Sequence, residues 1–269
     1  MSQGFGRVAL VSGGARGIGA ATVRRLAADG WDISFCHHRD EQAAETEKAA
    51  SELGARVLAV RADLTAAAEV TAWARRAEAD LGPVRAVVSC AGITRDQPLT
   101  LLTDADWRAV TDTGLDGVFH LCRAVLPAMM ERQSGRIVAV SSVSGVYGHS
   151  TAGAARAGIA GFTRALASQT RRYGIRANAV TPAAHAGRAD MTSIWPEATT
   201  APLTEAIALR RFASAAEAAD RVAFLLSAAA ADITGTVVEV PGGISLTLAG
   251  LGPVEIRPSR NQARSNGSA

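Results

Sequence analysis

A glycine-rich turn lies between the first apolar run of the chain, residues 8–12, and the first helical pattern. Its spacing, Gly-x-x-x-Gly-x-Gly, is one residue longer between the first two glycines than the usual dinucleotide fingerprint. Gly13 can adopt backbone angles that a side chain would forbid, and Gly17 and Gly19 allow a ligand to approach the backbone closely. The amides at the start of the next helix would then face a pyrophosphate. The turn therefore predicts a nucleotide site, and the alternative is a purely structural turn.

The rest of the chain alternates between short apolar runs and helical patterns. Such runs are typical of buried parallel strands, which we predict at 8–12, 32–36, 56–61, 86–90, 136–141, 176–180 and 236–240. Helices are predicted at 18–29, 41–53, 66–81, 104–132, 152–173 and 215–229. The pattern predicts an α/β fold: one doubly wound Rossmann domain over residues 1–249, with a seven-stranded parallel sheet and helices on both faces. Residues 250–269 are expected to form a flexible C-terminal tail.

Bulk composition excludes several classes of protein. The 269 residues carry a net charge of +3 with the charges dispersed, which does not indicate nucleic-acid binding. No apolar run is long enough to span a membrane, and no signal peptide is evident, so a cytoplasmic protein is expected. Cys36, Cys90 and Cys122 lack metal-ligand spacing, and we interpret them as buried free thiols in a reducing compartment. No metal site is predicted.

The loop after the second apolar run determines which dinucleotide would fit. A carboxylate there holds the ribose 2′-hydroxyl of NAD, whereas basic groups favour the 2′-phosphate of NADP. The sequence has His38 and Arg39 at this point, and Arg16 projects from the glycine turn. We therefore expect NADP(H) rather than NAD, the alternative being a solvated loop that happens to be basic. Asp63, after the third run, is placed either to accept a hydrogen bond from adenine or to cap the next helix.

Six segments together resemble the short-chain dehydrogenase/reductases, namely residues 12–19, 63–64, 90–96, 135–142, 233–235 and 242–246. Within that superfamily the chain is most similar to 3-oxoacyl-[acyl-carrier-protein] reductases and polyketide ketoreductases, over roughly residues 6–248. The resemblance implies NADPH-dependent reduction of a carrier-bound β-ketone in a tetramer. The turn and the resemblance together predict cofactor contacts from Ser12, Gly13, Ala15, Arg16, Gly17, Ile18, Gly19, His38, Arg39, Asp63, Leu64, Cys90, Ala91, Gly92, Arg156 and Pro182.

The same resemblance exposes departures at the catalytic positions. The family uses a tyrosine as proton donor, a lysine four residues later, a serine that orients the ketone and an asparagine in the fourth helix. Ser142 matches the serine, but Gly114 stands in place of the asparagine. Ala152 aligns with the tyrosine and Arg156 with the lysine, and the loop from Ser142 is about three residues short. Arginine stays charged and alanine transfers no proton.

Two loop residues offer substitute chemistry. Tyr147 and His149 follow Ser142 in a loop expected at the carboxyl ends of the strands, where a doubly wound fold places its site. Either one is a candidate proton donor, with Ser142 orienting the substrate. The alternative is that both are loop residues without a catalytic role.

Two hypotheses follow for the function. In the first, the chain is a non-catalytic partner of an active reductase paralogue, and NADP(H) supports its shape or is not productively bound. In the second, it is a biosynthetic enzyme that uses substitute residues, either as an NADPH-dependent ketoreductase or in a non-redox step. A homotetramer is the alternative to the hetero-oligomer, and neither nucleic acid nor membrane is an expected partner. An acyl carrier protein is a further candidate partner, for which Arg132, Arg171 and Arg172 flank helix ends.

Overall fold

The computed structural model describes residues 7–38, 42–95, 97–142, 152–182, 201, 204–205, 207–240 and 242. Seven strands form one sheet in the order β3-β2-β1-β4-β5-β6-β7, and every neighbouring pair is parallel. The predicted doubly wound α/β fold is confirmed. The strands are β1 (Arg7–Ser12), β2 (Trp31–His37), β3 (Val57–Arg61), β4 (Val84–Ser89), β5 (Gly135–Val140), β6 (Ile175–Pro182) and β7 (Val237–Val240).

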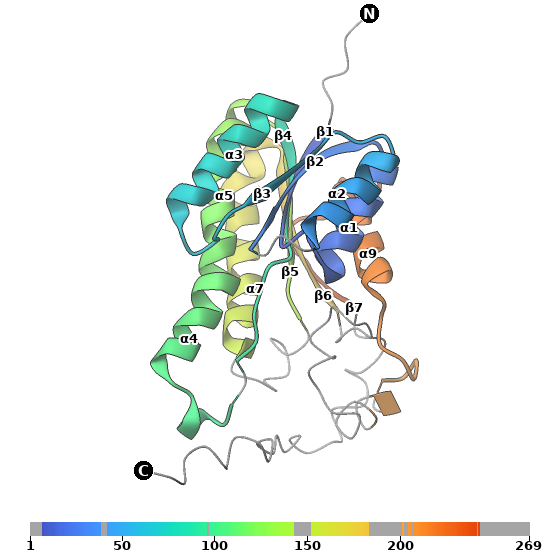
Figure 1. Ribbon diagram of the computed structural model, residues 1–269. Helices are drawn as coiled ribbons and strands as arrows, with labels where there is room; N and C mark the ends of the chain where they lie inside the picture. Colours follow the sequence, from blue (N-terminus) through green and yellow to red (C-terminus); the bar gives the residue numbers. More distant parts are fainter. Residues whose placement is uncertain are drawn as a thin grey trace, which may run out of the picture.

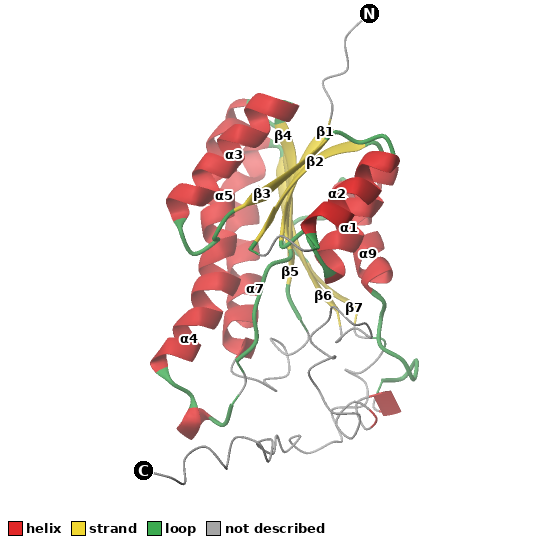
Figure 2. Cartoon of the chain, viewed as in Figure 1, coloured by secondary structure: helices red, strands yellow, loops and turns green. Residues whose placement is uncertain are grey.

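Helices cover both faces of the sheet (Figure 1). One face carries α1 (Gly17–Ala28), α2 (Ala43–Glu52) and α9 (Ala215–Leu226), and the other carries α3 (Ala67–Leu81), α5 (Gly117–Glu131) and α7 (Ala152–Thr170). Helix α4 (Asp104–Thr111) precedes α5 and contacts α7. Figure 2 shows the resulting three layers, with the yellow strands between two sets of red helices. The sheet order reverses direction between β1 and β4, and a doubly wound fold places its ligand at such a point.

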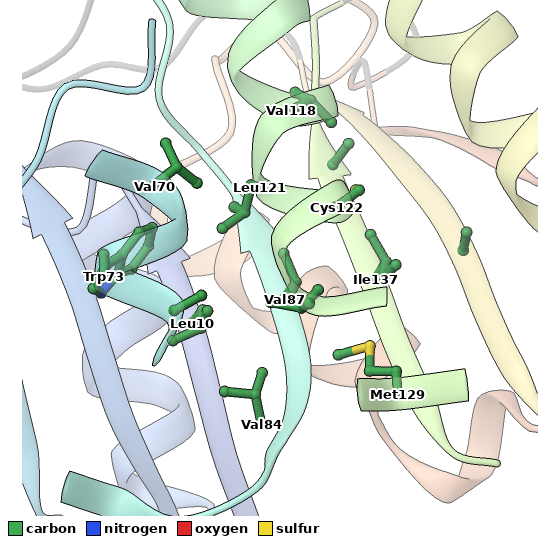
Figure 3. Close-up of a cluster of buried hydrophobic side chains, with 14 of the residues drawn as sticks. Leu10, Val70, Trp73, Val84, Val87, Val118, Leu121, Cys122, Met129 and Ile137 are labelled. Carbon is green, nitrogen blue, oxygen red and sulfur yellow. The ribbon is translucent and has the colours of Figure 1, made fainter. Parts of the chain in front are cut away.

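The core follows from the apolar runs. Strand residues alternate between the two faces, so β1 buries Val8 and Leu10 toward α3 and α5, and Ala9 and Val11 toward α1. Figure 3 shows the first of these clusters, in which Trp73 of α3 lies near Leu10. The cluster also contains Val70, Val84, Val87, Val118, Leu121, Cys122, Met129 and Ile137.

The predicted helical stretch over residues 104–132 is confirmed, and it is helical without interruption from 104 to 131. A π-helical turn, Asp112–Asp116, separates α4 from α5, and Gly114 lies at its centre. Glycine destabilises an α-helix by about 1 kcal/mol relative to alanine, which favours a local change of helix type here. The ends of two other predicted helices differ: 171–173 and 228–230 are 3-10 turns that follow α7 and α9.

The three cysteines are free thiols, as predicted. Cys36 and Cys122 are buried, whereas Cys90 is partly exposed as a residue. Removal from water raises the pKa of each thiol to about 12, because burial penalises the thiolate. The thiols are therefore protonated at neutral pH and poorly suited to act as nucleophiles.

Candidate nucleotide-binding site

The glycine turn after β1 is tightly fitted against its neighbours. Gly13 has a φ of 65°, and a Cβ there would lie 3.0 Å from the Ala91 backbone. A Cβ on Gly14 would lie 2.5 Å from Phe35 Cβ, and one on Gly19 would collide with the Gly13 carbonyl oxygen. Gly17 also has a positive φ, of 55°. The glycines are therefore required by the geometry of the turn itself.

Ser12 joins this turn to the end of β4. Its Oγ accepts hydrogen bonds from the backbone N–H groups of Cys90 at 3.2 Å and Ala91 at 3.3 Å. The same hydroxyl lies 3.3 Å from Ser89 Oγ. Ser12 is fully buried, so its side chain holds two loops of the predicted site together. Ala15 in the turn and Ile18 in α1 are partly exposed, and a Cβ added at Gly92 would meet no atom within 4 Å.

The start of α1 has the properties of an anion site. Arg16 occupies the N-cap position without a side-chain capping hydrogen bond, and no acidic residue lies in the first turn. The positive end of the helix dipole is thus left without a capping side chain. Arg16 and His38 are both exposed at this edge of the sheet, whereas Arg39 lies outside the described residues.

Asp63 organises the turn between β3 and α3. Its Oδ1 accepts hydrogen bonds from Thr65 N at 2.9 Å and Thr65 Oγ1 at 2.8 Å. These bonds to Thr65, with a smaller effect of the His38 charge, lower the pKa of Asp63 below its usual value. The N-cap of α3 is Ala66, so the expectation that Asp63 caps this helix is wrong. Its neighbour Leu64 is buried, and the Leu64 carbonyl accepts a hydrogen bond from His120 Nδ1 at 2.8 Å.

The first turn of α7 lies in an apolar environment. Ala152 is 1% exposed and Ala155 is 3% exposed, and they form a small cluster with Val110 of α4. Ile93, from the loop after β4, and Leu115, from the π turn, pack against this cluster. A Cβ on Gly114 would meet only Ala155 Cβ, at 3.9 Å, so a side chain at position 114 has room at its base.

One turn further along α7, Arg156 reaches across to the β4 loop. Its Nη2 donates a hydrogen bond to Thr94 Oγ1 at 3.2 Å. The Arg156 carbonyl accepts a hydrogen bond from Ser141 Oγ at 3.1 Å, which ties α7 to the end of β5. Sequence reasoning missed Thr94, Ser141 and His120, because none stands at a spacing that indicates a partner.

The remaining predicted residues divide into two groups. Ser142 and Pro182 are described, at the carboxyl ends of β5 and β6. Tyr147 and His149 lie outside the described residues. Arg132 is held within the fold, since its Nη2 donates to Glu78 Oε1 at 2.7 Å and to the Val84 carbonyl at 3.1 Å. It is therefore poorly suited to meet a carrier protein.

The described part of the chain has neither a metal-ligand group nor a membrane-spanning helix. No group of three or more His, Cys, Asp or Glu side chains there could hold a metal ion. Within the same residues, every helix is too short or too polar to cross a membrane.

The fold, the glycine turn and the β4 loop are those of a doubly wound dinucleotide-binding domain. The short chain dehydrogenase family model matches residues 7–198. The chain belongs to the short-chain dehydrogenase family.

Several proteins to which the chain is similar are reductases. Over 242 residues it is 39% identical to an acetoacetyl-CoA reductase of Synechocystis, which covers 88% of this chain and 95% of that protein. It is 35% identical to the 3-oxoacyl-[acyl-carrier-protein] reductase of Escherichia coli K12, covering 89% and 97% of the two chains. Among solved structures, a variant of the actinorhodin polyketide ketoreductase with NADPH is 31% identical to this chain, with a TM-score of 0.83. The match covers 91% of this chain and 99% of that one. The chain is thus ketoreductase-like, of fatty-acid or polyketide type.

Proposed function

We propose that the chain is a non-catalytic partner subunit of an active NADPH-dependent ketoreductase. The observation that carries the proposal is the environment of Ala152. At the position where the family resemblance expects a tyrosine proton donor, the chain has a methyl group packed among Val110, Ala155, Ile93 and Leu115. Neither Ala152 nor its four neighbours in this cluster has a side chain that can give a proton to a ketone.

Arg156 supports the same conclusion. In the family resemblance, a lysine at this position lowers the pKa of a tyrosine four residues before it. In this chain the residue four positions before Arg156 is Ala152, and Arg156 donates a hydrogen bond to Thr94. The guanidinium stays charged throughout the physiological range, so it cannot replace a proton donor. What it contributes is a link between α7 and the β4 loop, which holds the two sides of the site together.

The residues of the turn fit NADP(H). A close-packed backbone at Gly13 and Gly19, and a helix start without a capping side chain, suit the pyrophosphate. Arg16 and His38 are exposed where the 2′-phosphate would lie, and Arg39 is proposed to join them. When bound, NADPH supplies a hydride for ketone reduction. In this chain we propose that the nucleotide stabilises the site without giving up that hydride.

The surface for the partner is the outer face of α5 and α7. Phe119 on α5 is 42% exposed and meets Phe162 of α7 edge-on, with ring centroids 6.4 Å apart. Arg123 lies over the Phe119 ring at 5.0 Å. An exposed aromatic side chain that packs on a half-buried one of the adjacent helix is typical of an interaction surface.

Co-expression with an intact paralogue from the same organism tests the partner role. We expect the two chains to co-purify, with reductase activity that depends on the tyrosine of the paralogue. Phe119→Glu is expected to abolish co-purification, whereas Phe224→Glu, at a residue that is 44% exposed on α9, should not. Failure to co-purify, or reductase activity that survives loss of the paralogue's tyrosine, would overturn the proposal.

A further inference from the structure

Arginines gather at the end of the sheet opposite the glycine turn. Arg7 is the first residue of β1, and Arg85 and Arg136 are the second residues of β4 and β5. These three strands are neighbours in the sheet, and all of them begin at the same edge because the sheet is parallel. In Figure 1 this is the upper end of the sheet, where β1 begins. We refer to Arg7, Arg85 and Arg136 as the arginine cluster.

Within the described part of the chain, the arginine cluster has no acidic partner. Arg85 and Arg136 are both partly buried, and neither makes a hydrogen bond or ion pair with any residue that the structure describes. Burial, together with the positive charges of Arg7 and Arg85, lowers the pKa of Arg136 below that of an ordinary arginine. The charges that lower this pKa are thus two more cations, Arg7 and Arg85, which repel Arg136.

Other partly buried arginines of the described chain are compensated. Arg25 pairs with Asp29 and Asp220, and Arg132 pairs with Glu78. Arg176, beside Arg136 in the next strand, donates to four backbone carbonyls at the end of α9 and in the turn that follows, those of Leu225, Ser227, Ala230 and Ile233. Arg85 and Arg136 therefore differ from the rest by lacking a partner, rather than by their degree of burial.

Nearby acids do not supply the missing charge. The Asp29 carboxylate is occupied by Arg25, and only its backbone carbonyl accepts a hydrogen bond from Arg7, at 3.3 Å. Asp232 acts on Arg176. Residues 1–6, which precede β1, contain no Asp or Glu. Among the described residues, no carboxylate forms an ion pair with Arg85 or Arg136.

The arrangement points to a compact anion with more than one charge. Neighbouring strands lie about 4.8 Å apart, so the guanidinium groups of Arg85 and Arg136, on adjacent strands, are within reach of one small group, with Arg7 on the next strand. Guanidinium groups match phosphate oxygens through paired hydrogen bonds. We propose that the arginine cluster binds a phosphate-bearing ligand, at a second site on the edge of the sheet opposite the nucleotide. The ligand is either an inorganic phosphate species or the diphosphate of an organic molecule.

Titration calorimetry with inorganic phosphate, pyrophosphate and ADP, at matched ionic strength, tests the proposal. We expect wild-type protein to bind pyrophosphate, and Arg136→Gln or Arg85→Gln to weaken that binding at least tenfold. ADP that binds as tightly as pyrophosphate and responds equally to these substitutions would identify an organic diphosphate as the ligand. Tighter binding of the inorganic ions would identify the inorganic species.

Two control variants distinguish binding at the arginine cluster from binding at the nucleotide turn or to surface charge in general. Arg24→Gln removes an exposed arginine of α1, and Arg16→Gln removes one at the nucleotide edge. Arg24→Gln should keep pyrophosphate binding within about twofold of wild type, and Arg16→Gln should leave intact the component of binding that Arg136→Gln removes. The proposal is overturned if the wild-type protein binds none of the three anions, or if Arg24→Gln weakens binding as much as Arg136→Gln does. It is equally overturned if Arg16→Gln alone abolishes binding, because the anion then lies at the nucleotide turn.

Discussion

Gly19→Ala is expected to weaken NADPH binding at least tenfold, or by about 1.4 kcal/mol or more. The added Cβ would collide with the Gly13 carbonyl oxygen, so the backbone of the turn must move away from its present position. Overpacking of this kind also lowers the free energy of unfolding by about 1–3 kcal/mol. Calorimetric titration with NADPH and chemical denaturation measure the two effects.

Gly161→Ala is the matched control, since it makes the same change in another helix. A Cβ at Gly161 has open space, with nothing within 4 Å. Alanine is a better helix former than glycine by about 1 kcal/mol, so the control should be slightly more stable than wild type and bind NADPH unchanged. Equal NADPH affinity in Gly19→Ala and wild type would contradict the role of the turn.

Trp73→Ala is expected to lower the free energy of unfolding by about 3–5 kcal/mol. Trp73 is 1% exposed, and its Nε1 donates to Ser34 Oγ at 2.8 Å, which in turn donates to the Leu58 carbonyl at 3.0 Å. Truncation leaves a cavity beside β1 and removes the partner of a buried hydroxyl (Figure 3). Denaturant titration measures the loss.

The chain offers a control with the same substitution at the surface. Trp107 on α4 is 42% exposed, so Trp107→Ala should change the free energy of unfolding by less than about 1 kcal/mol. Similar losses in the two variants would mean that Trp73 does not hold the core as described.

The sheet was predictable because its evidence is local. Each strand reads as an apolar run bounded by helical patterns, and the glycine turn indicates where the first strand meets the first helix. Boundaries moved by one or two residues: β4, for example, begins at Val84 rather than at residue 86. The π turn at Gly114 was not predictable, since glycine weakens a helix without specifying what replaces it.

The candidate site was predictable only in part. Position 152 was expected to lack a proton donor, but its surroundings come from the β4 loop, α4 and the π turn, which lie far apart in the sequence. Arg156 was expected to face the cofactor, whereas the hydrogen bond to Thr94 depends on how α7 packs against the β4 loop. The arginine cluster is likewise three isolated residues in the sequence, brought together only by the strand order.

Hydride transfer by the isolated chain is the most direct test of a non-catalytic role. The purified protein is given NADPH and an acetoacetyl thioester, while binding of NADPH is measured separately by calorimetry. The proposed role predicts that NADPH binds. It also predicts that the absorbance of the reduced nicotinamide falls no faster than in a sample without the protein. Steady oxidation of NADPH with formation of the 3-hydroxyacyl product, lost in Tyr147→Phe or His149→Ala, would contradict it and assign catalysis to those residues.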